Sequence, residues 1–188
     1  MTQPATLDQI RAGYADARDR LHALAEPLSD EAFNWKPSRK AWSIGECIVH
    51  LNITGGAYAE PLTRAIREAA RGDGPAQYGF VSRKFIDAVR PGSRPIPTGG
   101  PMKPPATTGT QSDIEKARAL AGLDRTTDAL LAAVDVAEGR DLGSVRVASP
   151  FLRLMKLPAG AFLEAMSLHA LRHTEQAESV REAPGFPG

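Results

Sequence analysis

The sequence is poor in cysteine and has no long apolar run. A single cysteine among 188 residues cannot form an internal disulfide. The first residues, MTQPATLDQIRAG, lack the apolar segment of a secretory signal peptide, so a reducing, cytoplasmic location is expected. No apolar run approaches the ~18 residues that a membrane-spanning helix needs. These absences argue against a secreted protein and against a membrane protein.

Net charge is also nearly absent. Lys and Arg total 23 and Asp and Glu total 22, which leaves a formal charge of +1. Nucleic acids and anionic membranes attract a surplus of positive charge, so neither is expected as a partner. The length suits one domain with a full core, and we expect a single domain over residues 1–188. A small-molecule substrate is the expected partner, and the oligomeric state, including a homodimer, stays open.

Four segments show the three-four spacing of apolar residues that is typical of amphipathic helices. Helix starts are marked by capping boxes, in which a Ser or Thr and a Glu or Gln three residues later each bond the other's backbone. The expected boxes are Thr6 with Gln9, Ser43 with Glu46, and Ser112 with Glu115. Gly139 is expected to mark the end of the third helix, and the fourth covers roughly residues 159–182.

Together these segments predict an all-α fold, a four-helix bundle. The second segment has one apolar stripe through Ile48 and Leu51 and another through Val49 and Ile53, so it must touch more than one neighbour. Pro61 lies in the same segment and is expected to kink the helix or to remove one backbone hydrogen bond. Neither a sustained alternation of period two nor an internal repeat is present in the sequence.

Residues 72 to 110 differ from the rest of the chain in their composition. They are rich in proline and glycine and include the stretch RPGSRPIPTGGPMKPPATTGT. We expect a long connection without regular structure, which is unusual in a compact domain. Such a connection either covers a functional site or is a solvated excursion.

Two of the four histidines, His169 and His173, lie one helical turn apart in the stretch SLHALRHTEQ. On a helix they share an inward-facing stripe with Phe162 and Val180. A buried polar group without a partner costs about 1–3 kcal/mol, so each imidazole needs a hydrogen bond or a metal ion. Imidazoles at this spacing point at one position, and zinc, nickel, copper and iron accept such ligands. The pair alone fits either a metal site or a hydrogen-bonded core.

A third histidine, His50, lies on an inward-facing part of the second helix. If the second and fourth helices are neighbours, the three histidines can form a site that leaves coordination positions open for water or substrate. His22 lies beside the apolar stripe of the first helix, on the side of Arg11 and Arg18. We therefore expect His22 at the surface and not at a metal.

Two neighbours of His50 have alternative interpretations. Glu46 is one turn before His50 and could reach a metal, but its place in a capping box accounts for it. Cys47 could be a fourth ligand, or a small buried residue that packs against Trp42 at the hydrophobic-staple spacing. The structural role is favoured for both residues.

Three stretches resemble the DinB-like superfamily, which includes YfiT-like metal-dependent hydrolases and thiol transferases. They are NWKPSRKAWSIGECIVHLN, SPFLRLMKLPAGAF and LHALRHTEQ. The shared pattern is a tryptophan, a capped helix with His-Leu, and His-x-x-x-His with a trailing Gln. The resemblance covers most of the chain except residues 72–110. It implies a four-helix bundle of the DinB/YfiT-like type with a metal triad at His50, His169 and His173.

The resemblance also implies a reaction. A dication bound by three neutral histidines keeps its charge and deprotonates a coordinated thiol, which is otherwise only a few per cent thiolate at neutral pH. The expected enzyme therefore uses zinc, nickel or iron to activate a low-molecular-weight thiol, which attacks an electrophilic small molecule. A hydrolase that uses metal-bound hydroxide is one alternative. A non-catalytic bundle for stress response or small-molecule binding is the other.

Two further residues of the fourth helix are candidates for substrate binding. The planar guanidinium of Arg172 could hold a carboxylate of the thiol. Gln176 could hydrogen-bond a bound water or a ligand imidazole. For both side chains, hydrogen bonds at the surface or between helices are the favoured alternative. The catalytic residues themselves are not identified by the sequence.

Overall fold

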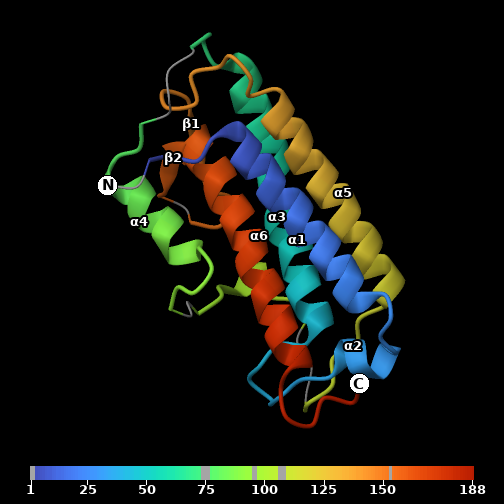
Figure 1. The fold of residues 1–188 in the computed structure, drawn as a ribbon. Coiled ribbons are helices and arrows are strands. Elements are labelled where there is room, and N and C mark those ends of the chain that lie inside the picture. The colour runs from blue at the N-terminus through green and yellow to red at the C-terminus, as the bar shows by residue number, and fades with distance from the viewer. Residues whose placement is uncertain (1–2, 73–76, 95–96, 106–108, 153) are drawn as a thin grey trace.

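Four long helices lie side by side and form the body of the molecule (Figure 1). The computed structural model describes residues 3–72, 77–94, 97–105, 109–152 and 154–188. The long helices are α1 (Leu7–Ala25), α3 (Ile44–Glu68), α5 (Lys116–Asp135) and α6 (Ala159–Arg181). The shorter elements are α2 (Asp30–Asn34), α4 (Phe80–Val89), the 3-10 turn η1 (Gly100–Met102), β1 (Arg146–Ala148) and β2 (Lys156–Pro158). The predicted all-α four-helix bundle is confirmed.

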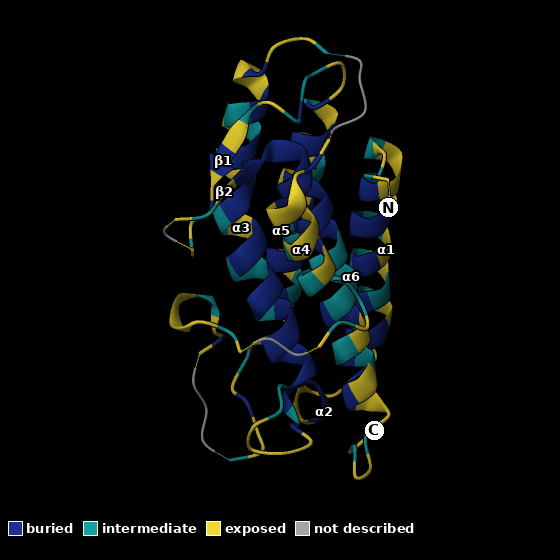
Figure 2. Ribbon diagram, turned by 90° about the vertical axis from the view of Figure 1, so that its left-hand side faces the viewer, coloured by how far each residue is buried: buried dark blue, intermediate teal, exposed yellow. Residues whose placement is uncertain are grey.

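The core of the bundle is interrupted by a polar layer. Helices α1 and α3 each pack against both α5 and α6, and their inner faces are buried (Figure 2). The buried apolar residues form two clusters, one of which reaches Met166 along α6 while the other resumes at Ala177. Between them lie His169, His173 and the fully buried Thr174. Because buried polar groups cost free energy unless they find partners, this layer is the natural place for a functional site.

Capping explains where two of the long helices begin. Both α1 and α3 start with the expected capping boxes, and α3 runs through Pro61 without ending there. The third expected box is wrong, because α5 begins at Lys116 and its N-cap Glu115 makes no side-chain capping bond. The hydroxyl of Ser112 bonds instead to Ser43, 2.7 Å away, and to the amide oxygen of Asn34.

The end of α5 also differs from the prediction. The helix stops at Asp135 with Val136 as its C-cap. Gly139, expected to mark the end, lies in the turn that follows and has a φ of 64°. That left-handed conformation favours glycine, so the residue is a turn signal displaced a few positions beyond the helix.

The proline- and glycine-rich connection is not structureless, which corrects the expectation for residues 72 to 110. It contains α4 and η1, and α4 packs against α6. The sequence of α4, FVSRKFIDAV, has neither proline nor glycine and places Phe85, Ile86 and Val89 toward the core. This local signal is outweighed when composition is averaged over the whole connection. Part of the proline-rich stretch, 95–96 and 106–108, lies outside the described residues.

A small antiparallel hairpin of β1 and β2 is the one sheet in the described part of the chain. It connects α5 to α6, and Val147 opposite Leu157 is buried under it. Strands of three residues are too short to show a periodic pattern, which explains why the sequence did not predict them.

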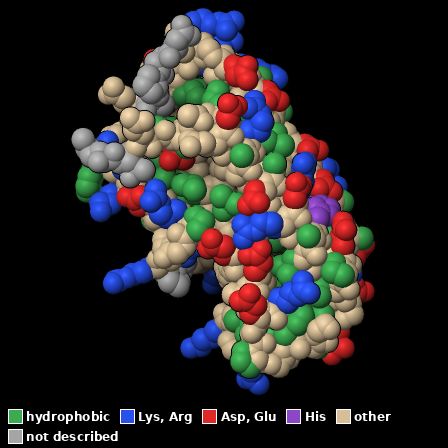
Figure 3. Space-filling view, in the orientation of Figure 1, with side chains coloured by type: hydrophobic (Ala, Val, Ile, Leu, Met, Phe, Trp, Pro, Cys, Tyr) green, Lys and Arg blue, Asp and Glu red, His purple; other side chains and the backbone are tan. Residues whose placement is uncertain are grey.

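The outer surface mixes charges of both signs, as the face in Figure 3 shows. Ion pairs link neighbouring helices, including Arg18 to Asp128 at 3.1 Å. His22 belongs to this surface network, because its ring nitrogens lie 2.9 Å from Glu26 and 2.8 Å from Asp124. It is therefore a paired surface residue of the α1–α5 contact. Among the described residues, none of the helices is long and apolar enough to cross a membrane.

Candidate metal centre

Three histidines from two helices meet in the polar layer. The capping box at Ser43 fixes the start of α3 and so places His50 about two turns into that helix. His169 and His173 lie on successive turns of α6, which packs against α3. One ring nitrogen of each histidine lies within 4.8 Å of the others, and ring centroids are 4.5 to 5.1 Å apart. The three histidines singled out in the sequence are thus brought together.

The orientation of His50 is fixed by a backbone carbonyl. Its Nδ1 lies 2.7 Å from the carbonyl oxygen of Met102, at the end of η1. A carbonyl can only accept, so Nδ1 carries the proton and donates. In the neutral ring Nε2 then has a free lone pair, and this atom lies 3.2 Å from Nε2 of His169. Part of the proline-rich connection therefore orients a candidate ligand.

The spacing of the nitrogens fits a metal ion. At metal–nitrogen distances of 2.0–2.1 Å and a tetrahedral angle, two ligand nitrogens lie about 3.3–3.4 Å apart. The separation between His50 and His169 is 3.2 Å. The largest separation in the cluster is at most 4.8 Å, so a movement of roughly 1.5 Å would bring His173 to coordination distance.

Two nitrogens of the cluster are buried without a hydrogen-bond partner in the described part of the chain. They are Nδ1 of His169 and Nδ1 of His173. Unpartnered buried polar atoms are rare because each costs about 1–3 kcal/mol. A partner outside the protein would remove this cost: an ion on Nδ1 of His173, or a hydrogen-bonding group on Nδ1 of His169 while its Nε2 faces His50. The donor set and its unpaired atoms therefore fit a bound divalent ion.

All three imidazoles are held in the neutral form that a metal requires. Burial lowers the pKa of His50, and the hydrogen bond to Met102 offsets part of that effect. Burial and then the nearby His173 and His50 lower the pKa of His169 well below its usual value. Burial lowers the pKa of His173 to about 3, against a smaller raising effect of a hydrogen bond with Gln176. At neutral pH the cluster offers three uncharged nitrogen donors.

Trp42 forms an aromatic wall on one side of the cluster. Its ring stacks on His173 with centroids 5.6 Å apart and an interplanar angle of 24°. It also lies 4.9 Å from the ring of His50. The sequence predicted the role of a staple for Trp42 beside Cys47 and did not place it at the cluster. Its place directly before the cap of the helix that carries His50 is the signal that could have identified it.

Neither neighbour of His50 belongs to the cluster. Glu46 accepts a hydrogen bond from the backbone N–H of Ser43 at 2.9 Å and pairs with the buried Lys36 at 3.2 Å. Cys47 is fully buried in the apolar cluster that Trp42 also contacts. Burial, followed by the charge of Glu46, raises the pKa of its thiol, which is therefore unreactive.

Arg172 lies beside the cluster but uses its guanidinium to hold the chain around the C-terminal end of α4. Its Nη1 lies within hydrogen-bond distance of the carbonyl oxygens of Ala88, Arg90 and Ser93 and of the hydroxyl of Ser93, and its Nη2 donates to the carbonyl of Arg94. A cation is favourable there because helix carbonyls leave partial negative charge at that end. Gln176 is partly buried and lies one turn after His173, whose pKa it raises. Gln176 is thus in contact with the cluster, and Arg172 fastens the segment next to it.

Comparison with known proteins identifies one family. A family model described as the DinB superfamily matches residues 14–177, which include all three histidines of the cluster. No curated protein matches the chain. No solved structure matches it either.

Proposed function

The protein belongs to the DinB superfamily, and from that premise we propose that it is a metal-dependent enzyme which transfers a low-molecular-weight thiol to an electrophilic small molecule. The observation that carries the proposal is the meeting of His50, His169 and His173 within 4.8 Å at the break in the core. Three neutral donors in a buried layer have little structural use there, because apolar residues would stabilise the core better.

In this proposal the three histidines hold a divalent ion, which is zinc, nickel or iron. Such an ion supplies its full +2 charge when its ligands are neutral, and that charge lowers the pKa of a coordinating thiol. Within the described residues the cluster contains no carboxylate, so no ligand charge would offset it. This donor set favours activation of a weak acid such as a thiol.

The proposed reaction is a substitution. The thiol loses its proton to solvent, its sulfur forms a bond to an electrophilic carbon, and the leaving group departs with the electron pair of its own bond to that carbon. Trp42 would shield one side of the histidines from water. Gln176 would hold His173 or the thiol by a hydrogen bond. Arg172 would bind a carboxylate of the thiol only after it releases some of the carbonyls around residues 88–94.

A hydrolase is the nearest alternative, and a non-catalytic binding bundle is the other. A hydrolase that activates water needs a general acid or base close to the reacting group. The carboxylate of Glu46, the nearest in sequence to His50, is engaged by Ser43 and Lys36 instead. Because the carboxylate of Glu46 is not placed to act as that acid or base, the site favours the transferase over the hydrolase.

The test measures turnover of a halogenated aromatic electrophile by zinc-, nickel- and iron-loaded protein with bacillithiol, mycothiol, glutathione and coenzyme A in turn. We expect metal-dependent turnover with at least one thiol. It should be lost in His173→Ala and kept in His22→Ala, since His22 pairs with Glu26 and Asp124 at the surface. Both variants are assayed well below their melting temperatures, because loss of a bound metal also lowers stability.

The outcomes separate the three functions. Turnover that requires both metal and thiol supports the transferase. Cleavage of simple esters without thiol, together with no thiol-dependent reaction, would replace it by the hydrolase. Absence of both activities in metal-loaded protein would favour the binding bundle.

A further inference from the structure

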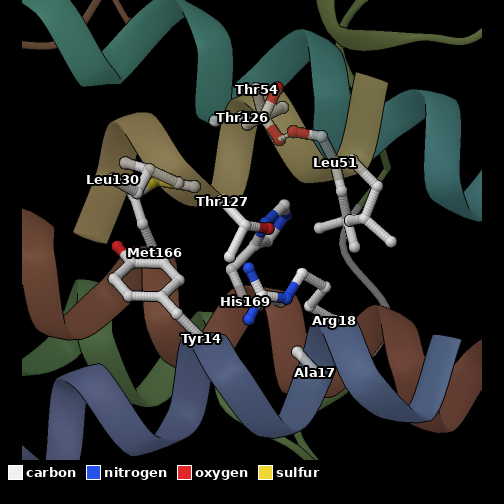
Figure 4. Close-up of a pocket in the computed structure, with 13 residues that line it drawn as sticks. Tyr14, Ala17, Arg18, Leu51, Thr54, Thr126, Thr127, Leu130, Met166 and His169 are labelled. Carbon is white, nitrogen blue, oxygen red and sulfur yellow. Dashed lines mark hydrogen bonds between the residues drawn. The ribbon is translucent and has the colours of Figure 1, made fainter. Parts of the chain in front are cut away.

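A narrow pocket reaches the candidate metal centre from inside the bundle (Figure 4). Its lining comes from all four long helices and includes Tyr14, Thr54, Thr127 and His169. The space open to the centre of a water molecule is ≈ 20 Å³. One buried water needs about 10–15 Å³ by this measure, together with two to four polar partners. The pocket is therefore large enough for one water and too small for a substrate.

Apart from the hydroxyl of the more exposed Thr126, two polar groups of this pocket have no partner within the described residues. One is Nδ1 of His169. The other is the hydroxyl of Thr127, a residue of α5 that is 6% exposed and forms no hydrogen bond in that part of the chain. The remaining buried hydroxyls already donate, from Tyr14 to the carbonyl of Leu163 and from Thr54 to the carbonyl of His50. Thr127 and His169 are thus the pair that a pocket water would join.

The proton on His169 must change place when a metal binds. Without metal, His50 keeps its proton on Nδ1 for the carbonyl of Met102, so its Nε2 is an acceptor. The contact of 3.2 Å then requires Nε2 of His169 to donate, which leaves Nδ1 of His169 as an acceptor. If Nε2 of His169 were to hold a metal ion, the neutral ring would carry its proton on Nδ1 instead. Nδ1 of His169 would then be a donor.

Nδ1 of His169 accepts a hydrogen bond in the metal-free protein and would donate one in the metal-bound protein. Its partner must therefore be able both to donate and to accept. A backbone carbonyl or a carboxylate accepts only, whereas water and a threonine hydroxyl do both. We propose that the pocket binds one water between Nδ1 of His169 and the hydroxyl of Thr127, and that this pair reverses its hydrogen bonds when the metal binds. Thr127 is then a positioning residue that acts on the metal through His169. The inference rests on the metal centre of the proposed function, but not on the thiol reaction.

The expected change in zinc affinity follows from the role that hydrogen-bond partners of ligand histidines have in metal sites. Loss of a group that holds a ligand histidine typically lowers metal affinity by about 10–100-fold. Thr127→Val keeps the shape of the side chain and removes the hydroxyl, so this loss is expected for zinc. Thr127→Ser restores the hydroxyl and should recover most of the lost affinity. Thr63→Val is the matched control, since Thr63 is a partly buried threonine of α3 outside this pocket.

Two measurements test the inference. Zinc affinity is measured by competition with a chelator in the unchanged protein and the three variants. ¹⁵N-histidine spectra of the metal-free and zinc-loaded protein report which ring nitrogen carries the proton. We expect His50 to keep its proton on Nδ1 in both states and His169 to move its proton from Nε2 to Nδ1. Unchanged zinc affinity in Thr127→Val, or a His169 proton that stays on one nitrogen, would overturn the inference.

A crystal structure of the metal-free protein separates failure of this inference from failure of the proposed function. If the unchanged protein takes up no zinc, the metal-dependent function is wrong. Density for a water within hydrogen-bond distance of Nδ1 of His169 and the hydroxyl of Thr127 would still support the water site. A pocket without that water would overturn it.

Discussion

Glu46 provides the sharpest test of which residues near His50 are structural. Its carboxylate lies 3.2 Å from the ammonium of Lys36, and the two side chains are 4% and 5% exposed. Glu46→Gln keeps an oxygen for the backbone N–H of Ser43 but leaves the charge of Lys36 buried without this carboxylate. Breaking one side of a buried ion pair costs about 3–5 kcal/mol. For a chain of this size that predicts a melting temperature lower by roughly 6–20 °C.

The assay pairs thermal melting with metal content. Glu46→Gln should lose stability by this amount and keep the metal content of the unchanged protein well below its melting temperature. Lys36→Met combined with Glu46→Gln should regain part of the stability, because the buried ammonium is then removed together with the carboxylate. The reasoning is refuted if Glu46→Gln lowers metal content and leaves the melting temperature unchanged, since Glu46 would then be a ligand.

Two further predictions concern the helix contacts around the site. Partial burial lowers the pKa of His22, but hydrogen bonds to Glu26 and Asp124 outweigh this and raise it, so His22 stabilises the fold below about pH 6.5 and loses this effect as pH rises through its raised pKa. The stability difference between His22→Gln and the unchanged protein should therefore be largest in mild acid, at about 1 kcal/mol or less, and a difference that grows at alkaline pH would contradict it. Arg172→Lys should increase hydrogen exchange in residues 80–94 while α1 stays protected, because a lysine has one nitrogen and cannot reach the carbonyls of Arg90 and Ser93 and that of Arg94 from two separate donor groups. Equal exchange in both proteins would show that Arg172 does not fasten this segment.

The bundle and the histidine cluster could be predicted because both leave periodic signals in the sequence. Apolar residues spaced by three and four mark the long helices, and His169 and His173 share that spacing. The capping box at Ser43 places His50 on the inner face of a second helix. These signals depend on side chains that recur with the helical period, which is what sequence patterns record.

The contacts that complete the site could not be predicted because they involve backbone atoms. The carbonyl of Met102 orients His50 across 52 positions of sequence, and any residue type could supply it. The carbonyls that accept hydrogen bonds from Arg172 could likewise belong to residues of any type. Thr127 is a different case, since it is a polar residue in the otherwise apolar stripe of α5. A threonine in an apolar stripe indicates that its hydroxyl has a polar partner in the core, and this could have been recognised from the sequence.

Elemental analysis tests the central claim most directly. The protein is purified without chelator and without nickel resin, and bound zinc, nickel and iron are measured per chain beside the His169→Ala variant. The account predicts about one equivalent of a divalent metal in the unchanged protein and a marked loss in the variant, since His169 supplies the nitrogen 3.2 Å from that of His50. A folded, unchanged protein that takes up none of these metals even when each is supplied in excess would contradict it.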